Sequence, residues 1–404
     1  MIEKSLYHGA KNNDLTQMNS ALLLDILRKR GVCSRVELAK ETGLTQAGIT
    51  KLVSSLIEQQ ILKETGILSQ NERGRKSIGL QLNDELGKVV SICFSRTFIK
   101  IAIFDINGRV YNNITVQLGH FKTLDDAMLH VLDLVKEYVV AFPDIKAIGI
   151  ALPGPYLRQS RQITVADSSF NWFAFRPQEI LEENLNLPVY PIHDADAAVL
   201  SYRWRNDVDS YKTLTYMLLG EGVGAGIVID GKLFEGSFGT AAEIGHMSID
   251  VKGIPCSCGN RGCLERYCST SAIVEKAKRV LNRHPDSGLN QYKELTYYDI
   301  FNEFDKMDPL ATSIINEACE YIGYGVVNLI NAYNPDLIVL GNIMCRSGVV
   351  LLNKVNEVVH ERIIPEIADK VEIRMEPQES DSILYGCAMN SVDYIISNAL
   401  SSNS

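Results

Sequence analysis

One histidine and three cysteines fall within eighteen residues of the chain, in the order His-x9-Cys-x-Cys-x4-Cys. Glycines at positions 253, 259 and 262 permit tight backbone turns that bring the four side chains together. Three thiolates and one imidazole are a common ligand set of a closed, tetrahedral zinc site. The pattern therefore predicts a structural Zn²⁺ ion held by His246, Cys256, Cys258 and Cys263.

Two alternative roles for these cysteines fit the sequence less well. Ordinary buried cysteines rarely cluster beside glycine-rich turns. A disulfide framework needs an oxidising compartment, and the N-terminal segment has neither the apolar stretch nor the cleavage site of a signal peptide. No run of eighteen apolar residues is present. We therefore expect a cytoplasmic protein without a membrane-spanning helix.

The 404 residues exceed what one ordinary core can hold, so two or three domains are expected. Charge is divided unevenly along the chain. Residues 1–82 contain 12 Lys and Arg against 8 Asp and Glu, a net charge of +4, which leaves −13 for the rest of a chain whose total is −9. A basic module on an acidic body is expected where only that module meets a polyanion.

Helices joined by tight turns are predicted near the N-terminus. After an unpatterned arm (1–15), an apolar pattern from about residue 19 indicates a helix that stops at Gly31. Ser34 and Glu37 have the spacing of a capping box, and the helix that they begin ends at Gly43. Two short helices around such a glycine turn favour a helix-turn-helix, although a plain three-helix bundle shares the local pattern.

The third helix, from residue 46 to about 60, offers short side chains at its N-terminal end, which suit base edges in a DNA major groove. We expect DNA contacts from Thr45, Gln46, Ala47, Thr50 and Lys51.

Two strand-like runs (61–68 and 77–82) then flank a basic tip, which is typical of a wing that enters an A·T-rich minor groove. A solvated charged turn is the simpler alternative. The tip residues predicted to contact DNA are Arg73, Gly74, Arg75 and Lys76. Residues 1–82 are therefore predicted to form a winged helix-turn-helix domain.

From residue 83 the pattern changes to an α/β type. Two hairpin strands (88–94 and 98–105) precede alternating helices and strands, which indicates a mixed sheet covered by helices. The same order repeats from about residue 213. Two similar α/β lobes in tandem predict a ligand cleft between them.

The zinc motif, together with the residues that flank it, resembles the signature of the ROK family (repressors, open reading frames and sugar kinases). The residues that carry the resemblance are Glu243-x-Gly245-His246 and Cys256-x-Cys258-Gly-Asn-Arg-Gly-Cys263-Leu-Glu265. With a winged helix ahead of it, the chain is similar to the transcriptional repressors of that family, of the xylose-repressor kind, from about residue 16 to the last helix. The resemblance implies two lobes of the actin-like, ribonuclease H-like ATPase fold, one of residues 83–197 with the helix at 380–400 and one of residues 198–379, which bears a structural zinc.

Kinases of this family hold ATP phosphates with glycine-rich turns, and all three such elements differ here. The first turn is Phe94-Ser95-Arg96-Thr97, without the usual acid and glycines; the second, 220–226, has Glu221 in place of a hydroxyl; the third has Gly341-Asn342 instead of Gly-Gly. We therefore expect that the protein is not an enzyme and that Asp194, which matches the kinase base, is vestigial.

The resemblance assigns sugar contacts to Asp194, Glu243, His246 and Glu265, with His193 in place of the usual Asn and Trp172 as a ring that stacks on the sugar. Convergent carboxylates and imidazoles suit a polyol, because each hydroxyl both donates and accepts a hydrogen bond. Each residue also has a simpler role open to it: Asp194 can cap a helix, and Trp172 can belong to the core.

The expected function is that of a sugar-responsive repressor of carbohydrate-utilisation genes, a homodimer or dimer of dimers on a pseudo-palindromic, A·T-rich operator. A sugar or short oligosaccharide in the cleft releases the DNA. The alternatives are an ATP-dependent sugar kinase with an added DNA-binding domain, and a regulator controlled by a protein partner. Activation instead of repression also fits the sequence.

Overall fold

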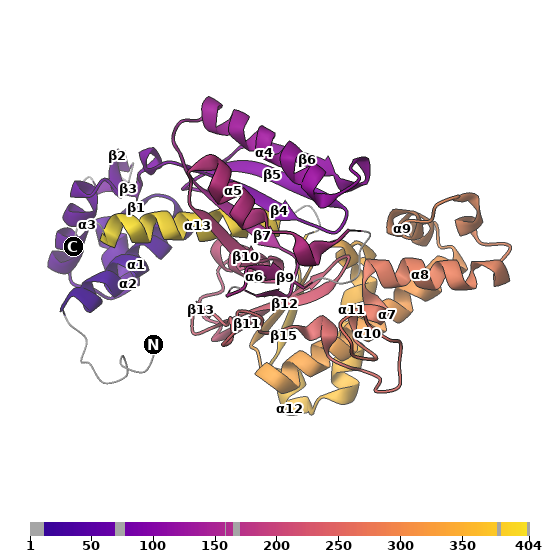
Figure 1. Cartoon of the computed structure of the whole chain (residues 1–404). Helices are drawn as coiled ribbons and strands as arrows, with labels where there is room; N and C mark the ends of the chain where they lie inside the picture. Colours follow the sequence, from indigo (N-terminus) through magenta and orange to yellow (C-terminus); the bar gives the residue numbers. More distant parts are fainter. Residues whose placement is uncertain (1–11, 69–76, 158, 165–169, 378–380, 402–404) are drawn as a thin grey trace.

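The computed structural model describes residues 12–68, 77–157, 159–164, 170–377 and 381–401. They form a small N-terminal unit and two larger α/β lobes (Figure 1). Within these ranges, no helix is both long enough and apolar enough to cross a membrane.

The N-terminal unit has the winged helix-turn-helix fold. Its elements are α1 (Asn12–Arg30), β1 (Cys33–Ser34), α2 (Arg35–Thr42), α3 (Gln46–Glu58), β2 (Leu62–Leu68) and β3 (Ser77–Leu82). The three strands form an antiparallel sheet in the order β1-β3-β2. The predicted capping box is present, since the Ser34 hydroxyl accepts from the Glu37 N–H while the Glu37 carboxylate accepts from the Ser34 N–H. The predicted cap of α3, Thr45, accepts from the Gly48 N–H.

Helix α1 begins at Asn12, several residues before the predicted start, and the supposed arm is therefore partly helical. The apolar pattern marks only the buried part of this helix, which includes Leu23, Leu24 and Leu27. No glycine or proline lies between residues 12 and 19, so nothing in the sequence ends the helix there.

Each lobe contains a five-stranded mixed sheet, and the two sheets share one strand order. The first runs β10-β7-β4-β5-β6, built from β4 (Lys88–Phe94), β5 (Phe98–Asp105), β6 (Val110–Gln117), β7 (Ile145–Leu152) and β10 (Val189–His193). The second runs β15-β14-β11-β12-β13, built from β11 (Thr213–Leu219), β12 (Val223–Ile229), β13 (Lys232–Leu233), β14 (Leu337–Gly341) and β15 (Glu372–Met375). In both, a central strand has antiparallel neighbours on one side and parallel ones on the other. The predicted repetition of the lobe is confirmed.

Helices cover both sheets, which explains the continuous apolar runs of the inner strands. Every residue of β11 is buried, and all but one residue of β4 and of β7, whereas the edge strand β6 is largely exposed. The first lobe carries α4 (Leu124–Ala141), α5 (Pro177–Leu185), α6 (Asp194–Arg205), α13 (Ser382–Ser401) and the short pair β8 (Tyr156–Leu157) and β9 (Gln162–Ile163). The second carries α7 (Glu265–Cys268), α8 (Thr270–Val280), α9 (Tyr297–Asp305), α10 (Pro309–Tyr333), α11 (Val349–Arg362) and α12 (Pro365–Ala368).

Helix α6 lies at the joint between the lobes, packed on β12 of the second sheet and on the last helix, α13 (Figure 1). Glycines make both contacts close. A Cβ atom added at Gly226 of β12 would stand 2.2 Å from the Ala195 carbonyl oxygen, and one at Gly386 of α13 would stand 1.8 Å from the Ala197 carbonyl oxygen. Because neither position has room for a side chain, α6 is held between the two elements.

The N-terminal unit contacts the first lobe through α1. The Arg28 guanidinium lies over the Trp204 ring of α6, 5.1 Å from its centroid, and pairs with Asp393 of α13. Arg203 of α6 donates to Asp25 of α1 at 3.1 Å. The far end of α6 therefore contacts the N-terminal unit.

Candidate functional site

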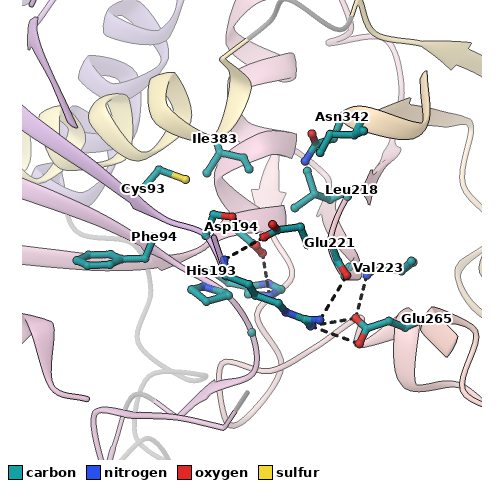
Figure 2. A pocket seen from close by; sticks show the side chains of 18 of the residues that line it. Cys93, Phe94, His193, Asp194, Leu218, Glu221, Val223, Glu265, Asn342 and Ile383 are labelled. Carbon is teal, nitrogen blue, oxygen red and sulfur yellow. Dashed lines mark hydrogen bonds and ion pairs between the residues drawn. The ribbon is translucent and has the colours of Figure 1, made fainter. Parts of the chain in front are cut away.

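A cavity of about 100 Å³, lined by charged and apolar side chains, lies between the lobes, where strand ends of both sheets meet (Figure 2). It brings together five of the six predicted sugar-binding residues, which come from distant parts of the chain: His193, Asp194, Glu243, His246 and Glu265. His193 and Asp194 stand where β10 passes into α6. Glu243 precedes a short helical turn in the second lobe, His246 is the last residue of that turn, and Glu265 begins α7.

His193 and Asp194 form an ionic pair at the cavity wall, with His193 Nε2 3.2 Å from Asp194 Oδ1. Burial lowers the pKa of His193, but the carboxylates of Asp194, Asp196 and Glu243 outweigh it, so the net shift is upward. Burial raises the pKa of Asp194, against the opposing effects of His193 and of the Ala195 N–H, which donates to Asp194 at 2.7 Å. Asp194 is the first residue of α6, which begins without a side-chain cap.

Glu243 stands near the same pair. Burial raises its pKa to about 7, helped by the neighbouring carboxylates of Asp194, Asp196 and Glu265 and opposed by His193. Near neutral pH, Glu243 therefore populates two protonation states. The protonated carboxyl group donates a hydrogen bond, and the carboxylate accepts one. Such a group suits a hydroxyl partner, which can do both.

Trp172 does not lie in the cavity, which corrects the expectation that its ring stacks on a sugar. Its side chain has no exposed surface and belongs to the core of the first lobe. The ring packs edge-on against Phe175, with centroids 5.8 Å apart. A large apolar ring gains more from complete burial here than from a place at a polar cavity wall. Trp172 is a core residue in this structure.

The four predicted metal ligands form a compact group. One ligand atom from each of His246, Cys256, Cys258 and Cys263 lies within 4.8 Å of the others. His246 Nδ1 is 3.8 Å from Cys256 Sγ, and Cys258 Sγ is 3.7 Å from Cys263 Sγ. Ligands at about 2.3 Å from a tetrahedral ion stand about 3.8 Å apart, so the spacing fits a metal ion of the size of Zn²⁺. The sulfur separation is far longer than a disulfide bond, and all nine cysteines are free.

The turn that would hold a phosphate in a kinase already holds a carboxylate of the protein. Glu221, from the β11–β12 turn, accepts from the Ser95 hydroxyl at 2.6 Å, from the Arg96 N–H at 3.0 Å and from the Thr97 hydroxyl. The sequence shows Glu221 in place of a hydroxyl, and the structure adds that its carboxylate accepts from the donors of the opposite turn.

Arg96 is a residue of the cavity that sequence reasoning did not assign. A signal for it exists in hindsight, because the two altered turns carry opposite charges: a base replaces a glycine in one and an acid replaces a hydroxyl in the other. Only the fold shows that the two turns face each other across the cavity.

The exposed face of α3 carries the residues predicted to meet DNA: Thr45, Gln46, Ala47, Thr50 and Lys51 are all exposed. The opposite face, with Ile49, Val53 and Leu56, is buried in the unit. The Thr50 hydroxyl donates to the Gln46 carbonyl at 2.8 Å. The predicted wing tip (73–76) lies outside the described residues, but the strands that would carry it, β2 and β3, pair as a hairpin.

A winged helix joined to two lobes of one strand order, with a carboxylate-bearing cavity between them, defines a DNA-binding member of the two-lobed, actin-like class of proteins. The profile of the ROK family matches residues 89–389, and the chain belongs to this family.

Individual relatives agree with that assignment. The xylose repressor of Caldicellulosiruptor bescii is 29% identical over 397 residues, which cover 96% of this chain and 97% of the repressor. A crystal structure of a ROK family transcriptional regulator, a homologue of the E. coli Mlc protein, superimposes with a TM-score of 0.76 at 25% identity, covering 96% of this chain and 98% of that one. A ROK family glucokinase from Streptomyces griseus, in complex with glucose and AMPPNP, gives a TM-score of 0.64 at 25% identity, covering 75% of this chain and 98% of the kinase.

Proposed function

We propose that the protein is a sugar-responsive transcriptional repressor of carbohydrate-utilisation genes, which acts in the cytoplasm and does not phosphorylate sugar. The observation that carries this proposal is the cavity itself. It keeps carboxylates suited to hydroxyl groups, while Glu221 occupies the turn that would bind a phosphate. This cavity is part of a chain that also bears a winged helix-turn-helix, and similarity to a xylose repressor over almost the whole length supports the same function.

Helix α6 can couple the cavity to the N-terminal unit, because it contacts both. It begins at Asp194 in the cavity, and its last turn contacts α1 through Arg203 and Trp204. Twelve helical residues span about 18 Å, so the two ends of one rigid element join the two sites. Suppose that α6 has two positions and that the sugar binds the protein more tightly in one of them. Sugar binding then shifts the population toward that position, and the winged helix, which contacts α6, moves with it.

On the DNA, we expect α3 to lie in the major groove and the wing, with Arg73, Gly74, Arg75 and Lys76, in an A·T-rich minor groove. In a homodimer, each of the two chains would then bind one half-site of a pseudo-palindromic operator. In a dimer of dimers, each dimer would bind in the same way.

The metal of the Cys3His group is proposed to be a structural Zn²⁺, since three thiolates and an imidazole leave no open position for catalysis. Its role is to fix the segment that carries His246 and Glu265 at the cavity wall. Loss of the metal should therefore weaken the response to sugar.

Selection of binding sites from random DNA, followed by gel-shift titration, tests the proposal. We expect a two-fold symmetric site that is released by D-xylose, D-glucose or a short oligosaccharide of either. Lys51→Ala should weaken DNA binding, whereas Lys278→Ala, an exposed lysine of α8, should leave it unchanged. Operator binding that no sugar alters would exclude sugar induction, and capture of a specific protein from lysate would then favour control by a protein partner.

The kinase alternative keeps one supporting feature, the position of Asp194 in the cavity beside the sugar-type carboxylates. Purified protein incubated with ATP and D-glucose or D-xylose decides it. We expect no sugar phosphate, because the Glu221 carboxylate occupies the donors that a nucleotide phosphate would need.

A further inference from the structure

Arg96 reaches across the cavity from the first lobe to the second. Its Nη2 donates to both carboxylate oxygens of Glu265 at 3.3 Å, and its Nη1 donates to the Glu221 carbonyl at 3.3 Å. The Arg96 side chain is 15% exposed and that of Glu265 is 7% exposed, so this ion pair is largely shielded from water. Figure 2 shows the carboxylate of Glu265 turned toward this contact.

Glu221 holds the backbone that carries Arg96. Its carboxylate accepts from the Arg96 N–H and from the hydroxyls of Ser95 and Thr97. Its own carbonyl accepts from the Ser271 hydroxyl at 3.2 Å, which ties the Glu221 turn to α8. Arg96 is therefore fixed at both ends, by Glu221 at the backbone and by Glu265 at the guanidinium.

The remaining space at Glu265 is small. Glu265 Oε2 already accepts from the Val223 N–H at 3.1 Å, and the guanidinium covers both oxygens. The cavity of about 100 Å³ falls below the roughly 300 Å³ at which ligand pockets usually begin. A ligand hydroxyl at Glu265 therefore competes with the Arg96 guanidinium for the same carboxylate.

We propose that Arg96 is an internal occupant of the sugar site, which takes the place of a ligand hydroxyl on Glu265 and is displaced when an uncharged sugar binds. The ligand of the cavity is taken here to be a sugar, as in the proposed function. Arg96 thereby sets a lower limit on ligand affinity, because a ligand binds only if its interaction with the site is more favourable than that of the guanidinium with Glu265.

The charges of the cavity determine the class of ligand. Once Arg96 has left Glu265, the ligand faces the carboxyl groups of Glu265, Asp194 and Glu243, with His193 as the basic neighbour. A phosphorylated or acidic sugar would bring like charge to these groups, whereas neutral hydroxyls can donate to them. Neutral sugars are therefore the ligands expected.

Calorimetric titration of the full-length, zinc-loaded protein with D-xylose, D-glucose and glucose 6-phosphate tests this. If unliganded protein keeps Arg96 on Glu265 about nine-tenths of the time, Arg96→Ala should tighten binding of the neutral sugar about tenfold. Glu221→Gln, which loosens the turn but leaves Arg96 and Glu265 in place, should tighten it less. Arg346→Ala, which removes an arginine paired with Asp305 away from the cavity, should leave the affinity unchanged. Circular dichroism and zinc content establish that each variant is folded.

If wild-type protein binds the neutral sugar and folded Arg96→Ala binds it equally or more weakly, the role proposed for Arg96 is overturned. The sugar-sensing function is then unaffected. Binding of glucose 6-phosphate that Arg96→Ala abolishes would also overturn that role, by making Arg96 a direct contact for an anionic ligand. A neutral sugar that binds only Arg96→Ala would support the proposal. No binding to any of the four proteins would overturn the sugar-sensing function and this proposal with it.

Discussion

Glu243→Gln removes an ionisable group from the cavity and leaves its shape almost unchanged. In the folded protein burial raises the Glu243 pKa from an ordinary 4.5 to about 7. That difference corresponds to at most about 3.4 kcal/mol. Because the side chain is partly exposed, solvent reduces the effect, and we expect about 1–2 kcal/mol.

The sign follows from the direction of the pKa shift. The folded state keeps a proton on Glu243 between pH 4.5 and 7, where the unfolded chain releases it. The contribution of Glu243 to stability is therefore fully present below pH 4.5 and is lost as the pH rises through 7. The glutamine variant has no such loss, so its unfolding free energy should gain about 1–2 kcal/mol relative to the wild type between about pH 5 and pH 8.

Urea unfolding of both proteins at several pH values across that range measures this difference. Glu183→Gln, on an exposed position of α5, is the matched control for replacing a glutamate by glutamine. A difference between Glu243→Gln and wild type that stays constant across the whole range would refute the reasoning, because Glu243 would then ionise as an ordinary exposed glutamate does.

Three further predictions concern the core, the metal and the lobe joint. Trp172→Ala should lower the unfolding free energy by about 3–5 kcal/mol. Trp172→Phe should leave sugar affinity unchanged in titration. A stable Trp172→Phe variant that no longer binds sugar would show that Trp172 contacts the ligand. Cys258→Ser should lose the one bound zinc per chain that we expect in wild type, as measured by mass spectrometry of the metal, and should melt at a lower temperature; unchanged zinc content would remove Cys258 from the ligand set. Gly226→Ala places a methyl group 2.2 Å from the Ala195 carbonyl oxygen and should cost about 1–3 kcal/mol in thermal or urea unfolding. Gly119→Ala, which meets no atom within 4 Å, is its control, and equal stability of the two would show that α6 is not held against β12.

Local features of the fold could be predicted because they depend on residues close together in the sequence. The capping box joins Ser34 and Glu37, three residues apart, and the bounds of β4 and β5 follow from short apolar patterns and their flanking turns. The start of α1 was predicted wrongly, since polar residues without a breaker carry no signal that distinguishes an arm from an exposed helical turn.

The site divides in the same way. The metal ligands lie within eighteen residues, so their spacing alone predicts the group that the structure brings together. The five residues of the cavity were assigned through resemblance to a family, and their residue types could not have located them in one place. Trp172 was placed wrongly by the same resemblance, because a motif predicts that an aromatic ring is present but not which side of a sheet buries it.

The sequence by itself determined the order of elements, the winged helix, the lobe repetition and the metal-binding group. Tertiary structure alone decided that Arg96 contacts Glu221 and Glu265, which lie 125 and 169 residues further along the chain. It also decided that α6 reaches from the cavity to α1. The physical reason is that a capping box or ligand cluster is closed by a few backbone angles, whereas contacts across the cavity depend on how two separately folded sheets face each other.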